Sequence, residues 1–210
     1  MSLLLLRIML GMGIIGHALN MYCDRILCIF PNGTINFSNI KEITEGDAAA
    51  KLMESTSEKI PMRSAVWGAF AIVLEFFGYS ALGIYTYGYS PIYGSVMLAA
   101  TAFFCITAAA YHVKTALAEY AFLNLGRNAD GKKMMLDLLN TAPVLRVCAL
   151  GLVVVLAVYV IVVVTGVIGF PIWALIFTIL PIVIVMFPFR IIGTLHIASM
   201  VSMLGWMLLL

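Results

Sequence analysis

Charged residues are scarce in this chain. Asp, Glu, Lys and Arg make up 10% of its 210 residues, whereas a soluble domain of this size carries roughly 25%. Hydrophobic residues make up 63%, and the mean hydropathy is +1.08. This composition excludes an ordinary soluble domain and is typical of a membrane protein. A net charge of +2 gives no argument for nucleic-acid binding, so no nucleic-acid partner is expected.

Motifs of common catalytic and cofactor sites are also missing. The sequence contains no G-x-S-x-G, no H-E-x-x-H and no phosphate-binding glycine loop, and no cofactor is therefore expected. The first apolar stretch has neither a basic region before it nor a small-residue cleavage site, so it is expected to be a retained helix. The four cysteines lack C-x-x-C spacing and are expected to be buried thiols: Cys23, Cys28, Cys105 and Cys148.

Six apolar stretches have the length that a bilayer requires. A helix rises 1.5 Å per residue, so about 20 apolar residues cross a hydrocarbon core of about 30 Å. The sequence therefore predicts a single-domain, all-α integral membrane protein with six transmembrane helices. The predicted spans are Leu3–Phe30, Arg63–Tyr87, Pro91–Leu123, Val144–Ile168, Pro171–Pro188 and Ile191–Leu210. The fifth span contains Pro181, where a kink is expected.

The orientation follows from the basic residues. Eleven of the twelve Lys and Arg residues lie on or beside the first, third and fifth connections, and Arg7 is the exception. The positive-inside rule predicts that these connections are cytoplasmic and that both termini are outside. The first connection is predicted to contain a short amphipathic helix over Asp47–Lys59, capped by Asp47 and resting on the membrane surface. A second short helix is expected around Lys132–Leu139.

Several ionisable residues lie within the predicted spans. Each costs about 2.5–3.5 kcal/mol on insertion scales, so such residues usually face a bundle interior or a wet cavity. In the first span, His17, Asn20 and Asp24 follow i, i+3, i+7 spacing and share one face. In the second span, the face that carries Glu75 consists mostly of small residues, which favours close helix packing around this carboxyl group. In the third span, His112 shares a face with Thr101, Cys105, Ala108, Thr115 and Glu119.

Counting residues along each span predicts two levels. Glu75 lies about 18 Å above the cytoplasmic surface, near mid-membrane, with His17 at a similar depth. Nearer that surface, a polar rim is expected from Asp24, His112, Arg190 and His196. Three histidines and Glu75 are residue types that bind zinc or iron, but their predicted depths differ, so no metal site is expected.

Structural explanations compete with functional ones at each position. Asp24 is suited to a salt bridge at the interface with Arg190, Arg146 or Lys114. The two rim histidines can be solvated or bonded to carbonyl groups. Glu75 is the hardest to explain structurally, because no Lys or Arg is expected at its depth. Its carboxyl group should be protonated, or hydrogen-bonded to His17, Tyr79 or Asn20.

Two resemblances add to this interpretation. The stretch Gly16–Leu27, followed by Pro31-Asn32-Gly33, resembles a family of small uncharacterised bacterial membrane proteins. In that family a small residue, an Asp and two apolar residues end the first helix before a Pro/Gly turn. The resemblance implies a bacterial cytoplasmic membrane and no particular activity. The layout of carboxyl and histidine groups on several helices is similar in kind to emopamil-binding sterol isomerases, in which acidic groups protonate a lipid double bond. No motif of the isomerases is matched residue for residue.

Three functions follow as hypotheses. The first is a cytoplasm-facing intramembrane pocket that binds a lipophilic small molecule or lipid and can transform it by acid–base chemistry. Glu75 would donate or accept the proton with His17 as its partner. The polar head group would be held by Asn20, Asp24, Tyr79, His112, Arg190 and His196. The second is a proton-coupled transporter or exporter, and the third is a non-catalytic scaffold, immunity or sensor subunit. Enzymatic activity and oligomeric state are left open.

Overall fold

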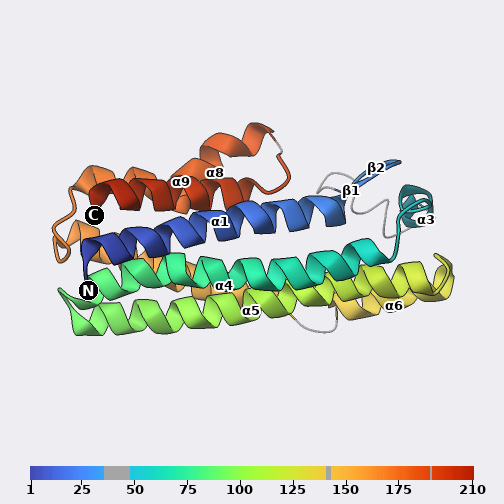
Figure 1. The fold of residues 1–210 in the computed structure, drawn as a ribbon, viewed down its shortest axis with the longest axis horizontal. Coiled ribbons are helices and arrows are strands. Elements are labelled where there is room, and N and C mark those ends of the chain that lie inside the picture. Colours follow the sequence, from blue (N-terminus) through green and yellow to red (C-terminus); the bar gives the residue numbers. More distant parts are fainter. Residues whose placement is uncertain (36–47, 141–142, 190) are drawn as a thin grey trace.

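The structure is almost entirely helical. It is a computed structural model that describes residues 1–35, 48–140, 143–189 and 191–210. Its helices lie side by side along one long axis (Figure 1). In the described residues, four helical segments are long and apolar enough to cross a membrane: Leu3–Cys28, Lys59–Tyr87, Pro91–Asn124 and Val144–Val164. The all-α prediction is confirmed, and four of the six predicted spans coincide with helices of membrane length.

Local sequence signals explain where the long helices begin. The Ser2 hydroxyl accepts a hydrogen bond from the Leu5 N–H and caps α1 (Leu3–Cys28). Helix α4 (Lys59–Tyr87) turns at Gly88–Ser90 into α5 (Pro91–Asn124), where Pro91 occupies the first turn and needs no hydrogen-bond partner. Helix α7 (Val144–Val164) packs on α5, with Gly151 directly against the Phe104 backbone.

The fifth predicted span is broken rather than kinked. It consists of η1 (Ile172–Phe177), α8 (Ile179–Met186) and η2 (Phe187–Phe189), separated at Thr178, whose backbone is extended. A helix cannot continue from η1 through Pro181, because proline has no N–H and its ring would clash with the carbonyl group four residues earlier. The break therefore lies three residues before the expected kink.

The sixth predicted span is short. Helix α9 (Thr194–Leu209) has 16 residues, which is about 24 Å of helix. It begins after Gly193, whose φ of +88° is a left-handed conformation that glycine adopts without strain. A Cβ atom on Gly193 would also meet the Met21 side chain at 2.6 Å. The start of α9 therefore lies beside Met21, about two turns before the end of α1.

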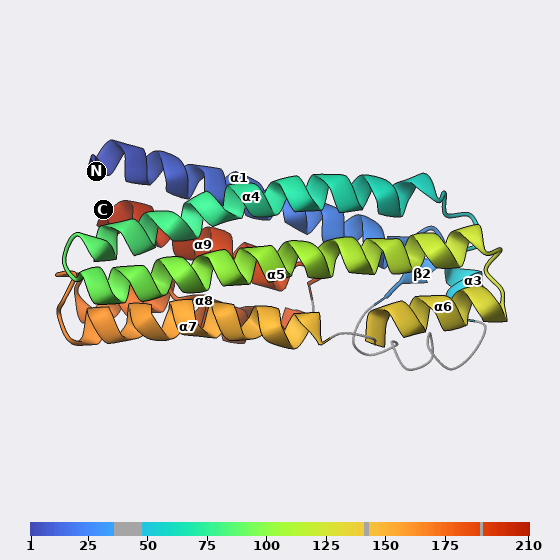
Figure 2. The ribbon, with the colours of Figure 1, turned by 90° about the horizontal axis from the view of Figure 1, so that it is seen from below.

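One end of the bundle is capped by short elements (Figure 2). These are the hairpin of β1 (Ile29–Phe30) and β2 (Gly33–Thr34), helix α3 (Ala48–Leu52) and helix α6 (Ala129–Asn140). Helix α6 confirms the short helix expected in the third connection. Helix α3 is shorter than the predicted Asp47–Lys59, and Ala49 and Met53 are buried in a core shared with α5 and α6. The predicted cap Asp47 lies outside the described residues.

The two ends of the bundle differ in charge. Both termini lie at one end, together with the connections that follow α4 and α7, and these connections contain no Lys or Arg (Figures 1 and 2). The opposite end carries the basic residues of the first and third connections that the structure describes: Lys51, Lys59, Arg63, Arg127, Lys132 and Lys133. For the first four connections, the alternation predicted from charge is therefore present in the fold.

Helices α1 and α4 are packed unusually closely by glycine. A Cβ atom on Gly13 would lie 2.7 Å from the Cα atom of Gly78, so the two backbones touch there. One turn further on, a Cβ atom on Gly16 would meet the Ala71 carbonyl oxygen at 2.6 Å and the Glu75 backbone nitrogen at 2.7 Å. This close approach brings the polar face of α1 against the polar face of α4.

Candidate functional site

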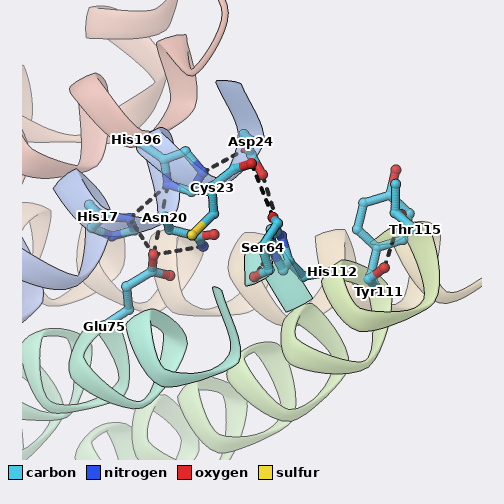
Figure 3. Close-up of polar contacts among 10 residues, drawn as sticks. All are labelled: His17, Asn20, Cys23, Asp24, Ser64, Glu75, Tyr111, His112, Thr115 and His196. Carbon is cyan, nitrogen blue, oxygen red and sulfur yellow. Dashed lines mark hydrogen bonds and ion pairs between the residues drawn. The ribbon is translucent and has the colours of Figure 1, made fainter. Parts of the chain in front are cut away.

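Seven polar residues from four helices gather inside the bundle (Figure 3). We refer to this group as the interior polar cluster. Its members are His17, Asn20 and Asp24 on α1, Ser64 and Glu75 on α4, His112 on α5 and His196 on α9. The predicted face of α1 is confirmed, because His17 and Asn20 are buried and Asp24 lies on the same side of the helix. The Asp24 side chain remains 38% exposed and forms the accessible edge of the cluster.

Glu75 is the most buried acidic group of the cluster, with 2% of its surface exposed. Its Oε1 atom accepts a hydrogen bond from Asn20 Nδ2 at 2.9 Å and lies 3.1 Å from His17 Nδ1. Two of the three partners predicted for this carboxyl group are therefore correct. Tyr79, the third, instead donates its hydroxyl hydrogen bond to Ser199 and contacts His17 through its ring edge.

His196 joins the two levels that residue counting had separated. Its Nε2 atom lies 3.0 Å from Asp24 Oδ2, and its Nδ1 atom lies 3.1 Å from His17 Nδ1. The predicted difference in depth between His17 and His196 is wrong. The broken fifth segment ends well short of the basic end of the bundle, so α9 starts beside Met21. The first turn of α9 therefore places His196 against His17.

His112 closes the cluster on the side of α5. Its Nδ1 atom lies 3.4 Å from Asp24 Oδ1, and its Nε2 atom lies 3.1 Å from the Ser64 carbonyl oxygen and 3.2 Å from the Ser64 hydroxyl oxygen. The Ser64 hydroxyl group also donates to the Cys23 carbonyl oxygen at 3.1 Å. The ring occupies the space above Gly68, because a Cβ atom there would overlap the imidazole.

Asp24 pairs with histidines in the described residues. The salt bridge predicted from sequence required a Lys or Arg partner, but the structure places one imidazole on each carboxylate oxygen. Arg190, the other predicted rim residue, lies outside the described residues. Arg25 lies beside Asp24 in sequence but donates to the Ile192 carbonyl oxygen at 3.4 Å, which fastens the connection before α9 to α1.

The hydrogen-bond roles around His196 can be assigned from its surroundings. Nε2 faces a carboxylate, which only accepts, so this nitrogen carries a proton. In the neutral ring Nδ1 is then an acceptor, and it faces both His17 Nδ1 and Glu75 Oε1. Two further buried atoms, His17 Nε2 and Asn20 Oδ1, have no hydrogen-bond partner among the described residues. The cluster therefore retains unused hydrogen-bonding capacity next to Glu75.

The side of the cluster toward the chain termini is apolar. Beyond His17 the ring of Tyr79 packs edge-on against Phe104 and Trp206, and Tyr159 packs on Trp206. These four aromatic side chains are buried in the main core of the bundle. In the described residues, the polar contacts of the cluster run from Glu75 toward Asp24, and aromatic rings lie on the other side.

Sequence reasoning missed Ser64 as a member of the cluster. The signal was available, since the small-residue face of α4 that carries Glu75 also contains Ser64, Gly68 and Ala71, and all four are buried. What the pattern could not show is that Gly68 leaves room for an imidazole from α5. The other predicted face, on α5, also points inward at Thr101, Cys105, His112 and Glu119.

Comparison with known proteins identifies the family of the chain. It belongs to a family of unknown function (DUF6796), whose model matches residues 1–209. This agrees with the resemblance to an uncharacterised family. No curated protein and no solved structure matches the chain. The function of the interior polar cluster therefore has to be argued from its chemistry.

Proposed function

We propose that this member of a family of unknown function is a multi-pass protein of a bacterial cytoplasmic membrane that binds a lipophilic small molecule or lipid at its interior polar cluster. Large apolar side chains on the outside of the helices support the membrane location. Trp67 and Phe70 on α4, Ile106 on α5, and Leu150 and Val153 on α7 are all exposed. A soluble monomer rarely exposes contiguous apolar surface of this extent, whereas lipid solvates it.

The proposed orientation has the basic end of the bundle in the cytoplasm and both termini outside. The structure supports four helices of membrane length, and six crossings require that the broken segment 172–189 and the 16-residue α9 also traverse the bilayer. Both segments pack alongside the long helices in the half of the bundle that contains the termini (Figure 1). Neighbouring helices can satisfy the backbone groups that a broken segment leaves free.

Reporter fusions test this orientation. Alkaline phosphatase fused after Leu210 is expected to be active, because the C-terminus would lie outside. The same enzyme fused within the first connection is expected to be inactive, and green fluorescent protein is expected to fluoresce there. An active phosphatase in the first connection together with an inactive one at the C-terminus would reverse the orientation. Two fusions of equal activity would show that α9 does not complete a sixth crossing.

The observation that carries the binding proposal is the unbroken series of contacts between Asp24 and Glu75. Asp24 is half-exposed, and His196 and His17 connect it to a carboxyl group that is 98% buried by surface area. Burying these groups costs free energy, and a ligand that bonds them offsets part of this cost. The polar end of the molecule would meet Asp24 and His112, and its apolar part would remain in the inner leaflet.

Transformation of the bound molecule by acid–base chemistry is part of this proposal. Glu75 and His17 lie 3.1 Å apart, a distance over which a proton is shared. The one-sided arrangement favours this function over a proton-coupled transporter, which needs a polar route on both sides of the site. In the described residues, a polar route from His17 toward the chain termini would have to pass the aromatic side chains of Tyr79, Phe104 and Trp206.

Lipids retained by the purified protein test the binding. Wild-type protein extracted in a mild detergent is expected to carry a molecule enriched over the bulk membrane lipids, identified by mass spectrometry of the organic extract. In Glu75→Gln and Asp24→Asn variants this enrichment is expected to fall at least about tenfold, the loss from one or two charge-assisted hydrogen bonds. Glu119→Gln is the matched control, because Glu119 is a buried carboxyl group on α5 that has no hydrogen bond or ion pair with the cluster among the described residues. Identical lipid profiles in all four proteins would contradict the proposal.

A further inference from the structure

Three potential metal-ligating atoms converge within the interior polar cluster. His17 Nδ1 lies 3.1 Å from both His196 Nδ1 and Glu75 Oε1, and the latter two atoms lie 3.8 Å apart. All three residues are at least nine-tenths buried. They come from α1, α4 and α9, so the helix packing alone brings them together (Figure 3).

The spacing of these atoms is that of ligands around one ion. The point in their plane that is equidistant from all three lies about 2.0 Å from each atom, and zinc binds imidazole nitrogen and carboxylate oxygen at about 2.0–2.2 Å. An ion at that distance would sit slightly out of the plane and keep a free coordination position. Two histidines and one carboxylate are also the donor set of catalytic zinc sites and of non-haem iron(II) sites.

Two of the three residues, His196 and Glu75, have neighbours placed as outer ligands usually are. His196 offers Nδ1 to the centre while its Nε2 faces Asp24 Oδ2 at 3.0 Å, which is the carboxylate–histidine–metal arrangement. Asn20 donates to Glu75 Oε1 and fixes the orientation of that carboxyl group. Each of these two contacts orients a ligand atom toward the same point. The predicted helix faces alone would bury these side chains without requiring that orientation.

The charges of the cluster also favour a bound cation. Asp24 and Glu75 are two carboxyl groups, and within the described part of the chain their ion-pair partners are histidines only. With Nε2 of His196 donating to Asp24 and both rings neutral, the rings bring at most one proton, on His17 Nδ1, to the three converging atoms. A divalent cation supplies two positive charges at the point where three lone pairs meet, and it leaves the Asp24 contacts unchanged.

We propose that His17, Glu75 and His196 bind one divalent transition-metal ion, zinc or iron(II), with Asp24 as the group that orients His196. This inference rests on the proposed function of the same site and deepens it. With the ion bound, the three side chains hold the metal, and a water molecule or the polar group of the lipophilic ligand takes the open position. The metal then supplies the acid–base or Lewis-acid chemistry that was assigned above to Glu75 and His17 directly.

Metal loading of purified variants tests this proposal. The protein is purified with a histidine-free tag, treated with a chelator and reloaded with zinc or, without oxygen, with iron(II). Mass spectrometry of the metal is expected to find about one ion per wild-type chain and under about one tenth of this in His17→Gln, Glu75→Gln and His196→Gln. Asp24→Asn is expected to bind about 10–100-fold more weakly. Size-exclusion profiles and helical circular dichroism establish that each variant is folded.

His112→Gln is the discriminating control. His112 belongs to the same cluster but contributes no atom to the converging set, so this variant is expected to retain the ion. A wild-type chain that binds neither zinc nor iron(II) better than folded Glu75→Gln would overturn the metal proposal. Equal loss in His112→Gln and His17→Gln would overturn the assignment of ligands. Lipid extraction from the same preparations decides the proposed function separately, because it needs no metal measurement.

Discussion

Replacement of Glu75 by alanine is expected to lower the free energy of unfolding by about 3 kcal/mol or more. The substitution removes the acceptor for Asn20 Nδ2 and the carboxylate partner of His17, both of which are buried. A buried polar group that loses its partner costs about 1–3 kcal/mol, and a charged one costs more. Glu75→Gln keeps an acceptor oxygen in nearly the same place, so its loss of stability should be smaller.

Unfolding in mixed detergent, with a chelator present to exclude any contribution from bound metal, measures these differences. Ser80→Ala is the matched control on the same helix, because the Ser80 hydroxyl is buried and has no hydrogen-bond partner among the described residues. Removing it should change the unfolding free energy little or increase it. If Glu75→Ala destabilised the protein no more than Ser80→Ala does, the carboxyl group would not be holding the cluster together.

Periodicity predicted which side chains face one another. The spacing of His17, Asn20 and Asp24 and the small-residue face around Glu75 were sufficient to place two helices against each other. The reason is that a polar residue in an apolar helix must turn inward wherever that helix is solvated by lipid or by apolar neighbours. The structure buries His17, Asn20 and Glu75 on these faces and joins them directly.

Depth was harder to predict than direction. Counting from the end of each span assumes that every apolar stretch is a straight helix across the bilayer, and the fifth stretch is not. Pro181 prevents one continuous helix, so the fifth segment is broken and the chain turns into α9 before it reaches the basic end of the bundle. His196 therefore lies beside His17 instead of near the basic end. A break of this kind depends on which backbone groups neighbouring helices can satisfy, and that is a tertiary property. The proposed metal site was not expected from the sequence for the same reason, because the predicted depths of its residues differed.

Glycine spacing sets the geometry of the cluster at its narrowest point. Gly16→Ala is expected to destabilise the protein by about 1–3 kcal/mol, because the new methyl group meets backbone atoms of Ala71 and Glu75 that cannot rotate away. Helices α1 and α4 would have to separate, which lengthens the contact between His17 and Glu75. The variant should therefore lose ligand or metal binding along with stability, although Gly16 itself has no side chain to bind either.

Gly11→Ala provides the comparison on the same helix, at a glycine that faces α9 rather than α4. Its new methyl group would meet only the end of Met207 at 3.9 Å, an ordinary contact, and alanine is the better helix former by about 0.5–1 kcal/mol. This variant is expected to match or exceed the wild-type stability and to retain ligand and metal binding at the interior polar cluster. Unfolding in detergent and metal loading of both variants measure the contrast. Equal behaviour of the two would show that α1 and α4 can move apart without disturbing the site, and that the close packing at Gly16 does not position Glu75.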